Sequence, residues 1–226
     1  MSSEVPTLTL TAIYERLLEA YGPQNWWPAE TRFEVMVGAI LTQSTAWTNV
    51  EMAIDNLKKA SILSPFGLRS ISLGILAKLV YPSGYYNAKA KKLKALAGYV
   101  GERFNDDFNM MRIQDTFILR SELLEVHGIG DETADAILLY ALDKPVFVID
   151  AFTRRIFNRL GIKPDNESYV AYQKLFTGHL LQDKEIFGEY HALIVRHAKE
   201  VCNKLPKCRQ CFLVNQCSTG RNNIRN

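Results

Sequence analysis

All four cysteines of this 226-residue chain lie in one short segment near its end. The segment reads CNKLPKCRQCFLVNQC, so Cys202, Cys208, Cys211 and Cys217 follow a C-x5-C-x2-C-x5-C spacing. Four thiolates this close in sequence can meet at one metal centre, and ligation by four cysteines is the common pattern for a cubane [4Fe–4S] cluster. We therefore expect the end of the chain to wrap a [4Fe–4S] cluster.

Two other interpretations of the cysteine segment stay open. A zinc site with four thiolates usually pairs two short C-x2-4-C knuckles, and only Cys208 and Cys211 form one here. Two disulfides would need an oxidising compartment, but the chain opens without the basic start and apolar core of a signal peptide. We therefore expect a cytoplasmic protein and favour the cluster over both alternatives.

Apolar residues recur at helical spacing almost throughout the chain, and alternating strand-like runs are scarce. The sequence therefore predicts an all-α fold. The expected helices cover residues 8–21, 31–45, 48–60, 73–80, 87–104, 117–126, 132–142, 152–160, 167–181 and 187–202. The one β-like run, PVFVI at 145–149, is interpreted as a buried connector. No apolar stretch approaches the ~20 residues of a membrane span, so no membrane association is expected.

The segment LLEVHGIGDETADAILLYAL at 123–142 has the pattern of two helices joined by a tight hairpin. Gly128 and Gly130 let the backbone turn and approach a partner closely, while Ile129 pins the hairpin between the helices. The second helix then presents free amide N–H groups that suit a phosphate oxygen. Taken alone, such a turn is more often plain structure than a DNA site. Together with the motifs that follow it, the turn leads us to expect that residues His127 to Gly130 grip a nucleic-acid backbone, with a monovalent cation at the hairpin as a further candidate. A net charge of +3 permits such a partner.

Asp150 follows the buried connector and precedes a helix that carries Arg154, Arg155 and Arg159. Aspartate favours the N-cap position, where its carboxylate accepts backbone N–H bonds. A capping carboxylate next to a helix N-terminus also stays ionised, as stabilising a developing cationic sugar would require. The structural and the catalytic interpretation of Asp150 are therefore compatible.

At this point the chain resembles the helix-hairpin-helix DNA glycosylases of the endonuclease III superfamily. The resemblance runs from about Phe33 to Cys217 and rests on motifs in the family's order: FEVMVGAILTQST, GYYNAKAKKL, LLEVHGIGDETADAI, VFVIDAFTRRIFNRLG, YHALIVRHAKEVC and the cysteine segment. It implies a six-helix barrel-like domain at 24–137 and a cluster domain built from 1–23 and 138–226. A cleft between them would receive a base flipped out of double-stranded DNA.

The same resemblance implies roles for single residues. Asp150 matches the catalytic aspartate, Gln43 matches the side chain that wedges into the duplex, and the four cysteines match the cluster ligands. We expect a monomer, associated with the nucleoid if its source is prokaryotic.

Two departures from the family pattern narrow the expected chemistry. Bifunctional members carry a lysine two places after the second hairpin glycine, and this chain has Glu132 there. A carboxylate cannot form a Schiff base, so water should be the nucleophile and strand cleavage should be absent. As a structural residue, Glu132 suits the first turn of a helix. Adenine-mismatch glycosylases carry a catalytic glutamate where this chain has Gly38, which disfavours that branch.

The tryptophans indicate what kind of base the protein would bind. All three, Trp26, Trp27 and Trp47, flank the helix that leads to Gln43. The segments NWWPAETRFE and LTQSTAW resemble the 3-methyladenine DNA glycosylase branch, where aromatic residues at these places sandwich the damaged base. The match puts Trp47 on one face of the base and Trp26 or Trp27 on the other, with Lys199 lining the site. Core packing for the tryptophans and phosphate neutralisation for Lys199 are the simpler alternatives.

The expected function is therefore a monofunctional DNA glycosylase of base excision repair. It would hydrolyse the N-glycosidic bond of alkylated purines and leave an abasic site. An alkylated purine carries a positive charge, which an indole face attracts and which weakens the glycosidic bond. An endonuclease III-like enzyme for oxidised pyrimidines or another damaged base is the first alternative. A non-catalytic binder of DNA lesions is the second, and the presence of Asp150 argues against it.

Other residues carry weaker signals. Four lysines on one expected helix could contact phosphate or form a solvated face: Lys89, Lys91, Lys92 and Lys94. A second basic group in the cysteine segment is expected to face DNA: Lys204, Lys207 and Arg209. His191 and His197 lie near the cysteine segment and are interpreted as packing or hydrogen-bonding residues.

Overall fold

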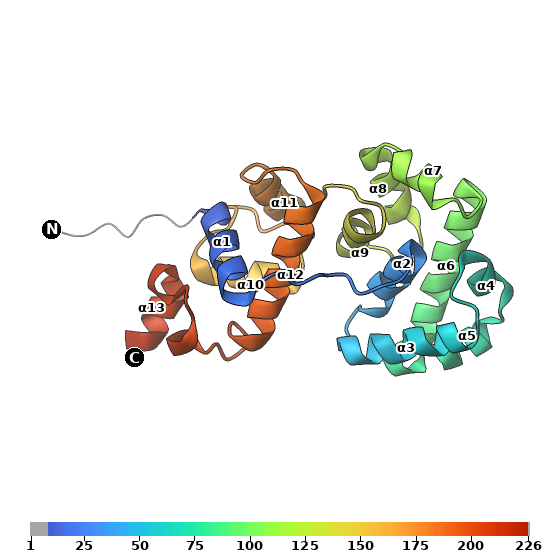
Figure 1. The fold of residues 1–226 in the computed structure, drawn as a ribbon, viewed down its shortest axis with the longest axis horizontal. Helices are drawn as coiled ribbons and strands as arrows, with labels where there is room; N and C mark the ends of the chain where they lie inside the picture. The colour runs from blue at the N-terminus through green and yellow to red at the C-terminus, as the bar shows by residue number, and fades with distance from the viewer. Residues whose placement is uncertain (1–8, 226) are drawn as a thin grey trace. The chain divides into compact units, whose positions relative to one another are not determined.

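The computed structural model describes residues 9–225, and every regular element in that range is helical (Figure 1). The predicted all-α class is confirmed. None of the helices in these residues is long and apolar enough to cross a membrane. The chain divides into two compact units, one formed by Trp27–Lys144 and one by the chain up to Trp26 together with the residues from Pro145 onward.

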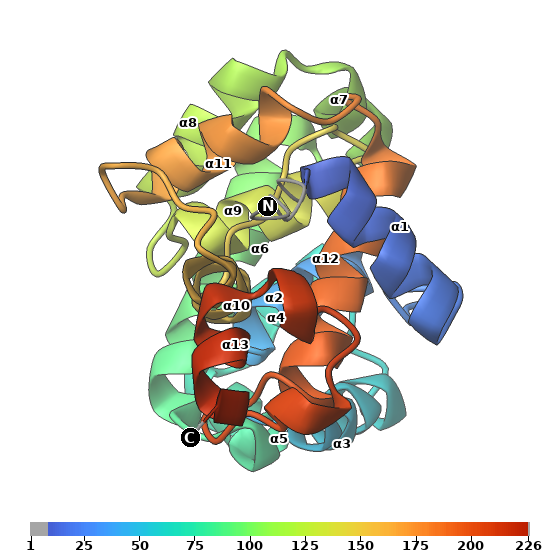
Figure 2. The same cartoon turned by 90° about the vertical axis from the view of Figure 1, so that its left-hand side faces the viewer.

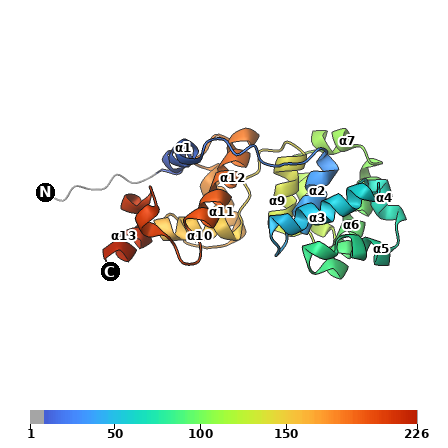
Figure 3. The same cartoon turned by 60° about the horizontal axis from the view of Figure 1, so that its bottom comes forward.

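The central unit, Trp27–Lys144, is built around one buried helix. Its elements are α2 (Arg32–Leu41), α3 (Trp47–Lys59), α4 (Pro65–Ser70), α5 (Leu73–Leu79), η1 (Tyr81–Ser83), α6 (Tyr86–Phe104), α7 (Phe108–Ile113), α8 (Thr116–Glu125), α9 (Asp131–Ala136) and the π-helical turn η2 (Ile137–Ala141). Every residue of α2 from Phe33 to Leu41 is buried, because α3, α6, α9 and η2 all pack on it. Helices α4 and α5 lie against α6 (Figure 3).

The second unit joins the two ends of the chain. Its elements are α1 (Leu10–Tyr21), α10 (Ala151–Leu160), α11 (Tyr169–Thr177), α12 (Lys184–Glu200), η3 (Cys208–Gln210), η4 (Val214–Gln216) and α13 (Ser218–Arg225). Helix α12 packs on both α1 and α10, and α10 also packs on α13, drawn in red in Figure 2. Buried rings fill the space between the helices, including a stacked pair, Phe147 and Phe176, whose centroids lie 4.1 Å apart.

Side-chain caps explain where most helices begin. In nine helices a Thr, Ser or Asp accepts a hydrogen bond from a first-turn amide: Thr9, Thr31, Ser64, Ser72, Asp107, Asp115, Asp150, Ser168 and Asp183. The helices α4, α7 and α13 were not predicted, because each is too short to show a clear 3.6-residue period. For α4 the cap Ser64 followed by Pro65 was an available signal.

The run 145–149 is a single extended connector and forms no strand. Phe147, Val148 and Ile149 are buried, as predicted. Side chains of α11 satisfy its buried backbone: Tyr169 accepts from the Ile149 amide at 3.2 Å, and Gln173 donates to the Phe147 carbonyl at 2.9 Å. The connector therefore needs no partner strand to reach Asp150.

The expectation that the α6 lysines form a surface is wrong for Lys89. Lys89 is buried, and its ammonium donates to the carbonyls of Leu41 at 2.8 Å and Ser83 at 2.6 Å. Lys94 likewise donates to backbone carbonyls before α5. Burial, followed by repulsion from Lys92, lowers the pKa of Lys89 to about 8. Lys89 therefore satisfies the free C-terminal carbonyl of α2 instead of meeting solvent.

We expect Lys89→Met to destabilise the protein. The substitution leaves two buried carbonyls without a donor, each at a cost of ~1–3 kcal/mol, so the free energy of unfolding should fall by about 2–4 kcal/mol. Lys91→Met, at an exposed position of the same helix, should stay within ~0.5 kcal/mol of wild type. Urea titration followed by far-UV circular dichroism measures both. Equal midpoints for the two variants would contradict this role of Lys89.

Candidate functional site

Asp150 is the N-cap of α10, as the sequence predicts. Only 7% of the residue's surface is exposed, and Oδ1 accepts the amide hydrogen of Thr153 at 2.6 Å. The second carboxylate oxygen, Oδ2, lies 3.6 Å from Nε2 of His191 on α12. A helix N-terminus and an imidazole thus face one buried carboxylate from two sides.

These neighbours keep the Asp150 carboxylate ionised. Burial alone would raise its pKa, but hydrogen bonding and electrostatic attraction from His191, together with the Thr153 amide, outweigh burial and lower the pKa below its ordinary value. Asp150 therefore carries a negative charge at every pH above the ordinary aspartate range. Such a buried, fixed charge can stabilise a developing cation or orient a water molecule.

The role of His191 was missed by the sequence analysis. We expected it near the cysteine segment, and the structure instead puts it against Asp150, with 6% of its surface exposed. The two residues are forty-one positions apart in the sequence, and no motif links them. His197, further along α12 than His191, does lie at the cysteine segment, and its Nε2 is 3.7 Å from Sγ of Cys211.

The hairpin between α8 and α9 has the expected geometry. Gly128 has a φ of +84°, a left-handed conformation that favours glycine, and Ile129 is buried between the helices. Gly130 is the N-cap of α9, and His127 and Gly130 are both exposed. Residues 127–130 therefore present backbone at the surface while one apolar side chain anchors the turn.

An ion-pair network fixes α8 against α9. Arg120 of α8 donates through Nε to the fully buried Asp135 at 2.7 Å and through a terminal nitrogen to Asp131, also at 2.7 Å. Hydrogen bonding to Asp135 is the largest of the effects that raise the pKa of Arg120. Glu132, at the position of the family lysine, is exposed in the first turn of α9 and offers no amine.

Gln43 follows α2 and is bound to the hairpin. Its Nε2 donates to the Gly128 carbonyl at 3.2 Å and to the Thr133 hydroxyl at 3.0 Å. Its Oε1 accepts from the Lys92 ammonium at 2.5 Å. The expected wedge residue therefore lies beside the expected DNA-gripping hairpin, although the two are far apart in sequence.

Trp27 and Trp47 meet in the central unit. The rings are 5.4 Å apart and nearly perpendicular, and Trp27 also contacts Tyr140 at 5.4 Å. The indole of Trp27 lies over Gly38, where an added Cβ would be only 3.1 Å from the ring. In this arrangement the two tryptophans touch each other edge to face and leave no gap for a base between them.

Trp26 and Lys199 pair in the other unit. The Lys199 ammonium lies 6.0 Å from the centre of the Trp26 ring, at the outer limit of a cation–π contact. Lys199 itself is exposed. The predicted base-contacting residues thus form two separate pairs, Trp27 with Trp47 and Trp26 with Lys199.

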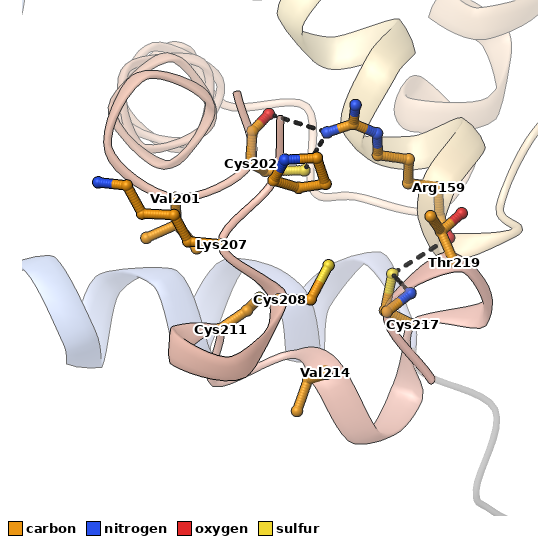
Figure 4. Close-up of a pocket in the computed structure, with 11 residues that line it drawn as sticks. Arg159, Val201, Cys202, Lys207, Cys208, Cys211, Val214, Cys217 and Thr219 are labelled. Carbon is orange, nitrogen blue, oxygen red and sulfur yellow. Dashed lines mark hydrogen bonds between the residues drawn. The ribbon is translucent and has the colours of Figure 1, made fainter. Parts of the chain in front are cut away.

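The four cysteines line one hollow, with Arg159, Val201, Pro206, Lys207, Val214, Thr219 and Gly220 (Figure 4). All four are free thiols, so the disfavoured alternative of two disulfides does not form in the structure. Within residues 9–225, no three His, Cys, Asp or Glu side chains are arranged to hold a single metal ion. The structure by itself therefore assigns no metal.

The chemistry of the hollow nevertheless fits an iron–sulfur cluster. Three of the sulfurs accept N–H bonds: Cys217 from the Gly220 amide at 3.2 Å, Cys202 from Arg159 at 3.3 Å, and Cys208 from Asn223 at 3.4 Å. Such donors stabilise thiolate sulfur and tune clusters. Arg159 also donates to the backbone carbonyls of residues 202–204, which holds the loop in place.

Four thiolates without a metal would be costly here. Burial is the main cause that raises the pKa of Cys211 to about 11, and the charges of the other three cysteines raise it further against the Leu213 amide. Burial also raises the pKa of Cys217. A cationic cluster core would offset this mutual repulsion, because metal binding replaces the thiol protons.

Comparisons with known proteins agree with this geometry. Residues 37–179 match the model of the HhH-GPD superfamily of base excision DNA repair proteins. A candidate DNA repair glycosylase of Methanocaldococcus jannaschii is 48% identical over 206 residues, which cover 91% of this chain and 94% of that protein.

Two solved structures are also similar. A complex of endonuclease III with DNA has a TM-score of 0.83 at 18% identity and covers 99% of this chain and 100% of its own. The 3-methyladenine DNA glycosylase of H. pylori bound to 1,N6-ethenoadenine has a TM-score of 0.70 at 30% identity, with 83% of this chain and 96% of that chain covered. The chain therefore belongs to the HhH-GPD superfamily, as a base excision repair DNA glycosylase of the endonuclease III type.

Proposed function

We propose that the protein is a monofunctional glycosylase that releases alkylated purines of the 3-methyladenine type from double-stranded DNA. It would act as a monomer and leave an abasic site. The observation that carries this proposal is the aromatic group formed by Trp27, Trp47 and Tyr140, in which Trp27 lies over Gly38. The similarity to a 3-methyladenine DNA glycosylase at 30% identity supports it.

The aromatic group suits a cationic base for an electrostatic reason. The face of an indole carries negative potential, and a desolvated cation over it gains about 2 kcal/mol. A base could stack on Trp47 once Trp27 turns away from its edge-on contact. The indole over Gly38 also occupies the space of the glutamate expected in adenine-mismatch glycosylases, which supports a different substrate branch.

Asp150 would supply the catalytic charge. An alkylated purine leaves without protonation because it is already cationic, so one carboxylate is sufficient where many glycosidases need two. The ionised Asp150 would stabilise the oxocarbenium-like sugar and orient water for attack at C1′. His191 would hold the carboxylate in place from α12.

The hairpin and Gln43 would bind DNA, and Glu132 would leave the protein without the amine needed for strand cleavage. The hairpin amides of Gly128 and Gly130 would hold a phosphate, with a monovalent cation at the hairpin as part of the same proposal. Gln43 would fill the space left by the flipped nucleotide. Glu132 has no amine to form an imine, so strand cleavage through a Schiff base is not expected.

We also propose that the four cysteines hold a [4Fe–4S] cluster. The N–H donors to three sulfurs and the shared hollow support it. When bound, the cluster would link Cys202, which follows α12, to the three cysteines of the C-terminal loop. That link would order the exposed basic residues Lys204, Lys207 and Arg209 for contact with phosphate.

The cluster proposal predicts metal content. Purified protein should be brown and contain about four iron and four sulfide per chain, by the cubane stoichiometry. Anaerobic purification followed by iron and acid-labile sulfide assays measures this. Cys208→Ser should lower the iron content, while Ser218→Ala should not. A colourless protein with one zinc per chain would contradict the cluster.

A panel of damaged duplexes tests the proposed reaction. Wild-type protein should release 3-methyladenine, and alkali should be needed to cut the strand. Asp150→Asn keeps a good N-cap but removes the charge, so excision should fall ~10²-fold or more while DNA binding is unchanged. Borohydride should trap no covalent complex on abasic DNA.

Each other outcome of this panel selects an alternative. Release of oxidised pyrimidines with borohydride trapping would indicate an endonuclease III-like enzyme. Binding of lesions without release of any base would indicate a non-catalytic protein. Full activity of Asp150→Asn would remove Asp150 from the mechanism.

If Trp47 recognises the positive charge of the base, replacing it should change the ratio of the excision rates on a cationic and a neutral damaged purine. Trp47→Ala should lose roughly thirtyfold more activity on 3-methyladenine than on a neutral damaged purine, if a contact of about 2 kcal/mol acts in the transition state. Loss of stacking alone would cost ~1–3 kcal/mol on both substrates and leave their ratio unchanged. Trp47→Phe should fall between wild type and Trp47→Ala. Single-turnover excision rates on both duplexes measure the effect, and an unchanged ratio would contradict charge recognition.

A further inference from the structure

Three segments of the central unit meet on one side chain, Gln43. Its amide contacts Lys92 of α6, the hairpin residue Gly128 and Thr133 of α9. We call these contacts the Gln43 network. The orientation of the amide is unambiguous, because an ammonium only donates and a carbonyl only accepts.

The network uses both N–H groups of Gln43. One donates to the Gly128 carbonyl and the other to the Thr133 hydroxyl, while the oxygen accepts from Lys92. A primary amide has two N–H donors. Gln43 therefore has none left for a DNA base until at least one of these contacts breaks.

The Lys92 side chain reaches Gln43 by lying along the hairpin. A Cβ added at Gly128 would overlap Cγ, Cδ and Cε of Lys92, so only glycine leaves room for this path. The ammonium then ends 2.5 Å from Oε1 of Gln43. Gly128 thus has a second role besides its left-handed backbone, since it lets a charged side chain cross the hairpin.

We infer that Lys92 is a positioning residue that holds Gln43 against the hairpin in the free protein and releases it when DNA arrives. This inference rests on the proposed wedge role of Gln43. Lys92 covers the hairpin that would hold a phosphate, and an ammonium binds an anionic oxygen more strongly than it binds a neutral amide oxygen. A phosphate at the hairpin therefore attracts the ammonium away from Gln43. Phosphate binding at the hairpin and release of Gln43 from Lys92 would therefore occur together.

Side-chain NMR of the full-length, metal-loaded protein tests the first half of this inference. The Gln43 amide signal is identified by its loss in Gln43→Met. Lys92→Met keeps the stem on Gly128 but removes the ammonium, so exchange of the Gln43 amide protons with water should become about tenfold faster or more. Lys92→Arg should restore slow exchange. Lys91→Met removes one positive charge from the neighbouring position of α6 and should leave the exchange rate of the Gln43 amide protons unchanged. Equal exchange in wild type and Lys92→Met would overturn the positioning role.

A duplex that contains a tetrahydrofuran abasic-site analogue tests the second half, because it needs neither a particular lesion nor excision. In wild type, saturation with this duplex should move the Gln43 amide signals. In Lys92→Met, where the contact between Lys92 and Gln43 is already lost, the change should be smaller. Binding by fluorescence anisotropy without any change of the wild-type Gln43 signals would overturn release.

Failure of the proposed function gives a different result from failure of this inference. A protein that does not bind the duplex would contradict the proposed function and, with it, release by phosphate. The comparison of free wild type with Lys92→Met would still decide whether Lys92 positions Gln43.

Discussion

In the second unit, helix α10 positions both the buried Asp150 carboxylate and the cysteine loop. At the N-terminus of α10, Asp150 accepts the Thr153 amide, which both starts the helix and keeps a buried carboxylate ionised. Near its C-terminus, Arg159 donates to the backbone and sulfur of Cys202, and the Arg159 carbonyl accepts from Ser218. A single short helix thus orients a charge at one end and the cysteine loop at the other. The connector before it stays extended because α11 side chains pair with its backbone.

Two cationic side chains, the buried Lys89 and the partly buried Arg120, play a comparable part in the central unit. Lys89 donates to the last carbonyl of α2, and Arg120 pairs with the buried Asp135 to hold α8 against α9. Both side chains satisfy polar groups that would otherwise be costly to bury. They fix the positions of the Gln43 segment and of the hairpin, and the Gln43 network then joins these two segments directly. The parts of the unit proposed to touch DNA are therefore held in place by two cationic side chains that bind other groups of the protein.

The sequence was a good guide wherever one residue and its immediate neighbours decide the outcome. Asp150 as an N-cap, the glycine-dependent hairpin and the grouping of the cysteines are local properties of this kind. The lysines of α6 show the limit of such reasoning. Lys89 and Lys91 are two positions apart and chemically identical, but one is buried and the other exposed. The difference is that the Lys89 ammonium reaches the carbonyl of Leu41, which ends α2 far earlier in the chain, and the carbonyl of Ser83.

By itself, the sequence determined the helical class, the main helices, the capping aspartate, the absence of an amine at Glu132 and the set of four thiols. These follow from periodicity, residue type and short spacings, which need no knowledge of distant contacts. Tertiary structure alone decided that His191 faces Asp150, that Trp27 covers Gly38 and meets Trp47 edge to face, and that Lys92 and Gly128 bind Gln43. The reason is physical: a side chain several ångströms long contacts whatever the fold brings within reach, and helix packing, rather than distance along the chain, determines which groups those are.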